Sequence, residues 1–173
     1  MSRFQVLLPF RVVIEVQAAF EDSVQVSSDA ETSFALVSDI ARSGAHFPSV
    51  DRLTPVDDAG RWRWKLKEKG IGPVRMKARY DAVYSSDPAT LSVDWRPPVT
   101  GSGDMKSYGS WKIEPGEHGG AILHFFAKTV IEVPAPGIFR KMVEAFAREE
   151  MVRQKKAYLA AIAVTLNQGT STS

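Results

Sequence analysis

The fold is decided by residues 136–166, which read PGIFRKMVEAFAREEMVRQKKAYLAAIAVTL. Pro134 and Pro136 introduce this stretch, and proline suits the first turn of a helix. We therefore expect one helix roughly 45 Å long at the usual rise per residue. A lone helix of that length has to bury its apolar side, and the strand-like segments before it are the available partner. This order predicts a curved sheet that grips the helix around an apolar interior.

Strand-like segments occupy most of the chain before this helix. Residues 61–67 alternate between apolar and cationic side chains, and residues 74–80 repeat the pattern. Further strands are expected at residues 91–96, around Trp111 and Ile113, and at residues 121–133. Strands that are apolar on one face only are typical of an antiparallel sheet with one solvated face.

The first part of the chain predicts a different arrangement. Residues 11–28 indicate one long strand or two shorter ones. Ser28 and Glu31 then have the spacing of a capping box, and Asp29 adds negative charge at a helix N-terminus. Two short helices, or one bent helix, are expected up to Pro48.

Length and composition favour an ordinary globular protein. The chain has 173 residues, which suits a single domain over 1–173 with a polar tail at 167–173. The formal net charge of +2 is too small to argue for nucleic acid as a partner. The absence of cysteine excludes disulfides, thiolate zinc sites and cysteine nucleophiles.

Membrane insertion and export are not indicated by the sequence. The apolar group at residues 6–8 is too short for the core of a signal peptide. The chain contains no run of about 18 apolar residues, so we expect no transmembrane segment. These features predict a cytoplasmic location, and they leave a peripheral contact with a membrane open.

Large aromatic side chains converge on the apolar face of the expected sheet. Together with apolar residues of the final helix, they would either fill a core or line a pocket. Under the pocket interpretation, the expected ligand-binding residues are Trp62, Trp64, Met76, Tyr80, Trp95, Trp111, Phe125, Phe139, Met142 and Phe146.

A polar patch interrupts the apolar side of the final helix. At about 100° per residue, the face that carries Phe139 and Phe146 continues into Glu149, Glu150 and Arg153. One interpretation is a solvated patch stabilised by side-chain pairs four residues apart. The other is that the helix crosses a cavity, so that these polar groups face its mouth or interior. The sequence leaves both open.

Taken together, these elements resemble the START-like superfamily, also called the helix-grip or SRPBCC fold. The resemblance extends over residues 11–166 and is carried by Ser28-Asp29-Ala30-Glu31-Thr32-Ser33-Phe34, by His46-Phe47-Pro48, by the tryptophan strand 61–67 and by Pro134-Ala135-Pro136. Glu31, Phe34 and Asp39 match an acidic residue, an aromatic residue and an aspartate that open the first helix in this superfamily.

The resemblance implies an α+β helix-grip fold. A curved antiparallel sheet of six or seven strands would wrap around the long C-terminal helix, with two short helices after the first strand. The superfamily includes polyketide cyclases and aromatases, lipid-transfer modules and plant hormone and allergen proteins, and the fold alone does not choose among these functions.

The three histidines, His46, His118 and His124, lack the spacing of a metal site, and we interpret His118 as solvated and His46 as structural. His124 lies between Leu123 and Phe125 on the last strand. If those two residues face inward, His124 faces solvent; in the reverse register it enters the pocket as a candidate acid or base. The polar groups that could belong to the cavity are therefore His124, Glu149 and Arg153, and we expect no metal and no cofactor.

Basic residues cover the other face of the expected sheet, at Arg61, Arg63, Lys65, Lys67, Arg75, Lys77 and Arg79. They could bind nucleic acid or anionic lipid, but acidic residues are interspersed among them. We interpret this surface as a solvated outer face, because aromatic groups that could stack on bases lie mainly on the opposite face.

The leading functional hypothesis is a protein that binds a hydrophobic small molecule or lipid inside the fold. The alternative is a cyclase- or aromatase-like enzyme in which Tyr80, His124, Glu149 and Arg153 would act on the ligand. Whether the protein is an enzyme stays open at this point. A homodimer is also compatible with the sequence, because the second half of the final helix is apolar.

Overall fold

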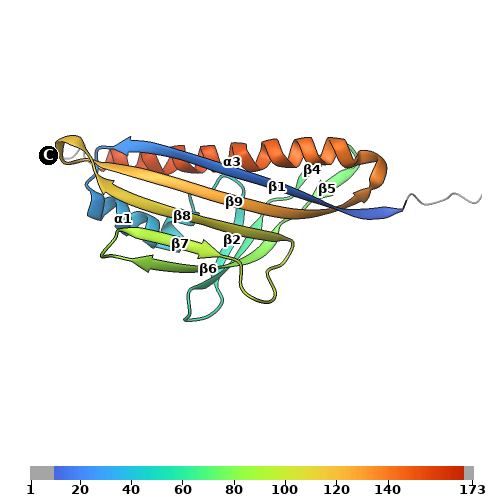
Figure 1. The fold of residues 1–173 in the computed structure, drawn as a ribbon, viewed down its shortest axis with the longest axis horizontal. Coiled ribbons are helices and arrows are strands. Elements are labelled where there is room, and N and C mark those ends of the chain that lie inside the picture. The colour runs from blue at the N-terminus through green and yellow to red at the C-terminus, as the bar shows by residue number, and fades with distance from the viewer. Residues whose placement is uncertain (1–9, 170–173) are drawn as a thin grey trace, which may run out of the picture.

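A computed structural model describes residues 10–169, and the apolar group at 6–8 and the last part of the polar tail lie outside this range. A seven-stranded antiparallel sheet in the order β1-β9-β8-β7-β6-β3-β2 curves around the C-terminal helix α3 (Figure 1). The main sheet contains β1 (Arg11–Val26), β2 (Val50–Pro55), β3 (Arg61–Leu66), β6 (Arg79–Asp87), β7 (Ser92–Arg96), β8 (Met105–Pro115) and β9 (Ala121–Pro136). The α+β helix-grip fold is therefore confirmed.

The longest pairing in the sheet joins the first strand to the last. β1 and β9 run antiparallel from Arg11 opposite Pro136 to Val26 opposite Ala121. Inward-facing residues of β1, such as Ile14 and Val16, are almost fully buried, while the residues between them are exposed. This alternation places the apolar face of both strands against α3.

Two short helices follow β1, as expected. α1 (Ala30–Ser38) and α2 (Ile40–Gly44) each begin after an aspartate whose side chain accepts a hydrogen bond from a backbone amide, from Thr32 to Asp29 and from Arg42 to Asp39. The expected Ser28–Glu31 capping box is therefore wrong, because Asp29 is the residue that caps α1. Ser28 instead donates its hydroxyl to the Leu166 carbonyl oxygen at the far end of α3.

The strand expected at residues 74–80 is divided in two. β4 (Lys69–Ile71) and β5 (Val74–Met76) form a separate hairpin, and β6 starts at Arg79. The chain between the two strands leaves the extended pairing, although the Ala78 carbonyl oxygen still accepts from the Leu66 amide. The hairpin turn contains Gly72 at a φ of 53°, a conformation that favours glycine. The hairpin thus leaves the main sheet and packs near the start of α3 (Figure 1).

Helix α3 (Arg140–Gln168) follows a short turn at η2 (Gly137–Phe139) and runs along β1 and β9 (Figure 1). It extends past the predicted end, so that Asn167 is helical and accepts a hydrogen bond from the Ser27 amide. Among residues 10–169, no helix is both long and apolar enough to cross a membrane.

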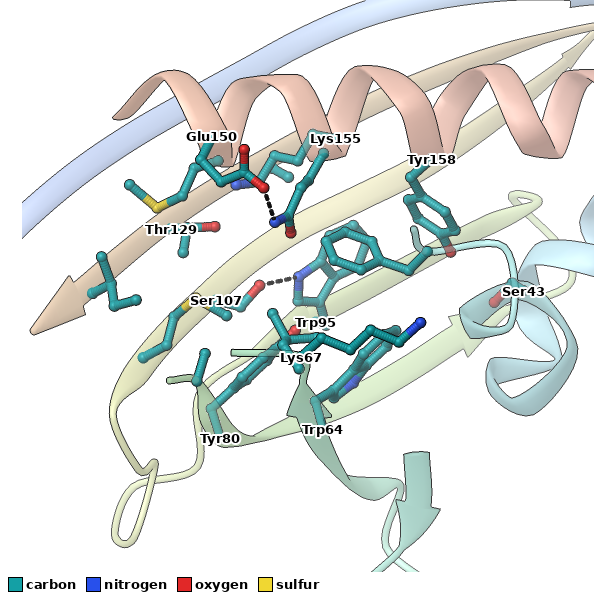
Figure 2. A pocket seen from close by; sticks show the side chains of 18 of the residues that line it. Ser43, Trp64, Lys67, Tyr80, Trp95, Ser107, Thr129, Glu150, Lys155 and Tyr158 are labelled. Atoms are coloured by element: carbon teal, nitrogen blue, oxygen red, sulfur yellow. Dashed lines mark hydrogen bonds between the residues drawn. The ribbon is translucent and has the colours of Figure 1, made fainter. Parts of the chain in front are cut away.

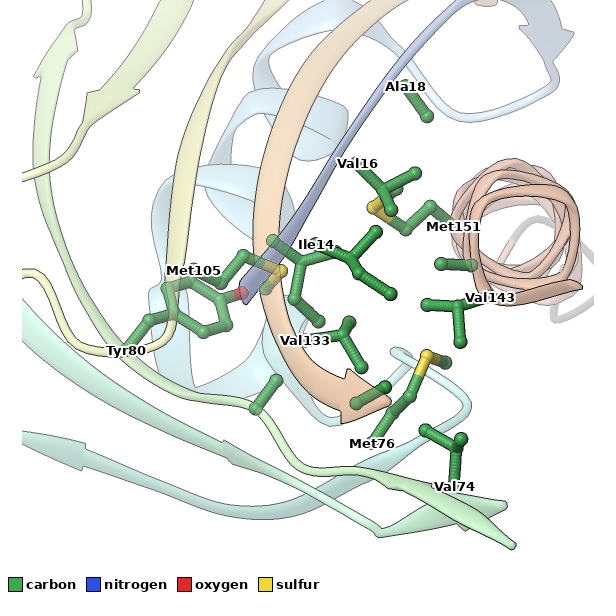
Figure 3. Packing of buried hydrophobic residues seen from close by; sticks show 14 of the residues in the cluster. Ile14, Val16, Ala18, Val74, Met76, Tyr80, Met105, Val133, Val143 and Met151 are labelled. Carbon is green, nitrogen blue, oxygen red and sulfur yellow. The ribbon is translucent and has the colours of Figure 1, made fainter. Parts of the chain in front are cut away.

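Buried apolar residues form two clusters along α3. The first lies near the start of the helix and includes Ile14, Val133 and Val143, with Val74 and Met76 from the hairpin (Figure 3). The second lies near the end and includes Leu123, Leu159, Ile162 and Leu166. The last three residues had suggested a dimer surface, but they are buried within the chain itself.

Candidate functional site

A cavity lies between α3 and the concave face of the sheet. Its free space is about 1010 Å³, with the solvent at its mouth included. Most of its lining is apolar, and side chains from β3, β6, β7, β8 and β9 form the wall opposite α3 (Figure 2).

Six of the ten predicted ligand-binding residues line this cavity: Trp64, Met76, Tyr80, Trp95, Trp111 and Phe125. Trp64 and Tyr80 stack with ring centroids 6.0 Å apart, and Trp111 lies 4.4 Å from Phe125. Strand alternation explains their convergence, because each points to the concave side of its strand. The Trp95 Nε1–H donates to Ser107 Oγ over 3.0 Å, which fixes the tryptophan ring against the wall.

The other four predicted residues lie outside the cavity lining. Trp62 is partly buried against the second apolar cluster. Phe139, Met142 and Phe146 are partly buried against the first cluster, where the hairpin and α3 fill the interior. Met142 also comes close to Gly72 of the hairpin turn.

The face of α3 that lines the cavity differs from the face that its apolar residues predict. The residues that line the cavity from α3 are Ala147, Glu150, Met151, Gln154, Lys155 and Tyr158. Their spacing of three, four and seven residues places them on one side of a helix. Of the polar patch that one interpretation placed at the cavity, Glu150 lines it, whereas Gln154 and Lys155 were missed because they are polar. Val143, Ala147 and Met151, four residues apart, form the apolar pattern that could have revealed this face.

Glu150 is the acidic residue of this wall, and it is held by a network of ion pairs. Arg153 Nη2 lies 2.7 Å from its carboxylate, Lys69 Nζ lies 2.8 Å away, and Gln154 Nε2 donates over 2.7 Å. Gln154 in turn accepts from Ser49 Oγ. Burial acts to raise the pKa of Glu150, but the bonds from Arg153, Lys69 and Gln154 outweigh it and lower the pKa to about 2. Glu150 therefore stays ionised.

The three polar residues predicted for the cavity lie outside its lining. Glu149 is exposed, and Arg153 reaches Glu150 from the solvent side with its own side chain largely exposed. His124 faces outward because Leu123 and Phe125 are buried, and its ring bonds Ser23 Oγ over 2.7 Å. Of the two registers considered for His124, the structure therefore has the solvent-facing one.

Lys155 was not singled out from the sequence, yet it is the most unusual residue of the cavity. Only 6% of its surface is exposed. No hydrogen bond or ion pair joins its ammonium to any of the residues 10–169. Burial lowers the pKa of Lys155 to about 8, and no neighbouring charge contributes to the shift. A long cationic residue within an apolar helical stripe was the available sequence signal.

Three tyrosines also border the cavity. Burial raises the pKa of Tyr158 to about 12, and it also raises the pKa values of Tyr80 and Tyr84 well above the ordinary tyrosine value. Their hydroxyls therefore stay protonated near neutral pH. They can bind a ligand's polar atoms as neutral donors or acceptors.

The basic residues of the convex face are mostly paired with acids. Arg61 and Arg63 contact Asp81, Lys65 contacts Asp51 at 2.9 Å, and Lys77 contacts Glu68 at 3.3 Å. Such pairing agrees with a solvated outer face. The prediction is wrong for Lys67 and Lys77, which line the cavity together with Lys69, because the chain leaves the main sheet after Leu66 and forms the β4–β5 hairpin. Over the part of the chain that the structure describes, no three acidic or histidine side chains cluster as metal ligands.

Comparisons with known proteins agree with this architecture. The model of a family described as polyketide cyclase / dehydrase and lipid transport matches residues 17–162. An aromatase/cyclase from a Streptomyces species has a TM-score of 0.68 at 14% identity, covering 90% of this chain and 97% of that chain. A search of curated proteins found no match.

Two further solved structures have the same fold. A START superfamily protein from Mycobacterium smegmatis has a TM-score of 0.58 at 20% identity, covering 88% of this chain and 99% of that chain. Norcoclaurine synthase from Thalictrum flavum has a TM-score of 0.57 at 13% identity, covering 87% of each chain. At such identities the likeness concerns the fold alone.

Proposed function

This chain belongs to the polyketide cyclase / dehydrase and lipid transport family, within the START-like superfamily, and on that basis we propose that it binds a hydrophobic small molecule or lipid inside the fold. The observation that carries the proposal is the largely apolar cavity between α3 and the sheet, lined by side chains of both. Its aromatic and aliphatic walls would stabilise a ligand by roughly 25 cal/mol per Å² of apolar surface removed from water, before ordering costs.

Native mass spectrometry of freshly purified protein, followed by solvent extraction, tests this proposal. We expect a discrete additional mass, or uptake of the neutral fluorescent probe N-phenyl-1-naphthylamine when the protein is isolated without ligand. A protein that carries no extra mass and takes up no probe would contradict the proposal, because its interior would then be closed to ligands.

A cavity-filling variant makes the test specific. Ala147 is buried and lines the cavity from α3, so Ala147→Phe should reduce probe binding by occupying the ligand's volume. Val164→Phe is the matched control, because Val164 is exposed on the same helix. Equal probe binding by both variants would place the bound probe elsewhere on the molecule.

A cyclase-like enzyme is the second candidate, and the family description and the polar groups of the cavity favour it. A general acid or base works best when its pKa lies near the working pH. The pKa of Glu150 lies far below this range, and the pKa values of the three tyrosines lie above it. Lys155 is therefore the group that could exchange a proton near neutral pH. This scarcity of acid–base groups favours binding over catalysis.

The extracted ligand also separates these two candidates. A binding protein returns its ligand with an unchanged mass after incubation. A cyclase that closes a ring by aldol addition and then dehydrates the product returns a molecule lighter by one water. Turnover that fell by orders of magnitude in Lys155→Met would favour the enzyme.

A further inference from the structure

Lys155 is the most deeply buried cationic group of the cavity, and it has no partner among residues 10–169. It projects from α3, on the wall opposite Trp64 and Tyr80 (Figure 2). The carboxylate nearest in sequence on the same wall, Glu150, is already held by Arg153 and Lys69. Within residues 10–169, no acid lies within ion-pair distance of Lys155.

A buried ammonium without a counter-ion is unfavourable for folding. Charged groups withdrawn from water are normally paired. A methionine of similar length would fill the same space without this penalty. The arrangement becomes favourable only when an anion enters the cavity and pairs with the ammonium.

Two hydroxyls on the facing sheet add further donors to the cavity lining. Ser107 on β8 lies directly opposite Thr129 on β9, and both line the cavity (Figure 2). Ser107 Oγ accepts from Trp95, so its own hydrogen stays available as a donor. Thr129 Oγ1 makes no hydrogen bond with the described residues. A carboxylate has two oxygens that could accept from an ammonium and two hydroxyls.

The overall charge of the cavity lining also favours an anionic ligand. The ionisable side chains that face it from all elements are Lys67, Lys69, Lys77, Glu150, Lys155, Tyr80, Tyr84 and Tyr158. Four of these are cationic and one is anionic at neutral pH, since the tyrosines stay protonated. Such a lining attracts an anionic ligand and disfavours a cationic one.

We infer that the ligand is an amphipathic acid, whose carboxylate pairs with Lys155 while its apolar part lies against the aromatic wall. This inference rests on the proposed binding function and narrows its ligand class. A monoanionic carboxylate matches one ammonium and two hydroxyl donors. A phosphate group carries more charge and an additional acceptor oxygen, which these donors would leave unsatisfied.

Displacement of N-phenyl-1-naphthylamine by dodecanoic acid and by 1-dodecanol tests the inference, because the two ligands share an apolar chain and differ in the head group. We expect the wild-type protein to bind the acid about tenfold more tightly, or better, at pH 7. This comparison needs no variant. The preference should weaken as the pH rises above 8, where the unliganded Lys155 loses its proton; the pKa of Lys155 is about 8.

Two substitutions locate the anion. Lys155→Met should remove the preference for the acid and leave binding of the alcohol almost unchanged, whereas Lys155→Arg should retain part of it. Lys156→Met is the matched control, because it removes the same charge from an exposed residue of the same helix that does not line the cavity. We expect the control to keep the preference.

The outcomes separate this inference from the proposed function. Equal binding of acid and alcohol by the wild-type protein would overturn the inference and leave the binding function standing. A preference that survived Lys155→Met would also overturn it, since the anion would then bind elsewhere. No displacement and no probe uptake would overturn both.

Discussion

Among residues 10–169, three charged side chains are buried, and two of them, one on each side of the curved sheet, have opposite surroundings. Asp81 on the convex face is 2% exposed and is contacted by Arg61 at 2.6 Å and Arg63 at 2.8 Å. Its backbone amide also bonds Ser102 in the loop between β7 and β8. Lys155 on the concave side is almost as deeply buried, but no acid among residues 10–169 lies within ion-pair distance of it.

The contrast distinguishes a charge that stabilises the fold from a charge that is available to pair with a ligand. The Asp81 carboxylate is neutralised entirely within the chain, so that its burial supports the junction of β3, β6 and the adjoining loop. The Lys155 ammonium gains nothing comparable from the chain. Natural proteins depart from locally favourable arrangements mainly at functional sites, where stability is lower than the fold could provide.

The largest effect is expected from removing the paired charge. Asp81→Asn should lower the free energy of unfolding by about 4 kcal/mol, because it leaves two arginines without their shared counter-ion. Urea denaturation at pH 7 measures this change. Hydrogen bonds from Arg63, with those from Arg61, lower the pKa of Asp81. Its contribution is therefore present above the ordinary aspartate pKa and is lost as the pH falls through the lower folded value.

Asp51→Asn is the control for this prediction. Asp51 pairs with Lys65, but both side chains are largely exposed to solvent. Surface pairs contribute little because water and salt screen them. If the two substitutions destabilised the protein equally, the burial of Asp81 would not matter and the comparison would fail.

Removing the unpaired charge should have the opposite sign. Lys155→Met should raise the free energy of unfolding of the unliganded protein at pH 7, by up to about 3 kcal/mol for a lysine whose pKa falls from 10.5 to about 8. Between those pH values the unfolded chain binds a proton that the folded chain has released. Wild-type stability should therefore rise from pH 8 to 10.5, and the variant should lack this rise.

Thermal and urea denaturation across that pH range check the prediction. The ligand-free state of both proteins has to be established first, because a bound acid would stabilise the wild type and hide the difference. A less stable Lys155→Met protein would mean that Lys155 has a stabilising partner, contrary to the comparison.

An intermediate effect is expected at Glu150, which lies in the cavity wall but has partners. Glu150→Gln should lower the free energy of unfolding by about 1–2 kcal/mol, since Arg153 and Lys69 are partly solvated and can be rehydrated. The pKa of about 2 lies below the ordinary glutamate value. The wild type should therefore lose this contribution between about pH 4.5 and 2, as urea denaturation over that range can show.

The smallest effect is expected at His124. Its ring is 42% exposed and bonds Ser23 and Glu114 on the outer face of β9. His124→Ala should change the free energy of unfolding by about 0.5 kcal/mol at most, and should leave ligand binding unchanged. A large loss of binding, measured with the fluorescent probe, would show that His124 reaches the cavity after all.

The fold was predictable because its signals are regular. Alternation in residues 61–67 and 91–96 identified strands, and the uninterrupted stretch after Pro136 identified the final helix. The division of residues 74–80 was missed, because Lys77 and Ala78 continue the alternating pattern of β5 while the chain leaves the sheet. The alternation of apolar and polar residues within a segment does not indicate where the chain changes its strand partner.

The cavity was predictable only where the sheet forms it. Strand alternation predicts the inward positions of Trp64, Tyr80 and Trp95, because each residue of a strand points to one of only two faces of the sheet. A helix has no such binary choice, and apolar content placed Phe139 and Phe146 on its inner face instead of Lys155. The expectation that charged residues face solvent fails at a binding cavity, because the group that would pair with the charge there is not part of the amino-acid sequence.

The pairing of β1 with β9 also constrains how the chain comes to be folded. The first strand of the sheet hydrogen-bonds to the last one along its whole length. On a ribosome adding about 5–20 residues per second, β1 would wait several seconds or longer before Pro136 is made. Its apolar residues and unpaired backbone remain available to other chains during that interval. This topology is therefore more exposed to misassembly while the chain is being synthesised in a crowded cell than after the protein has folded.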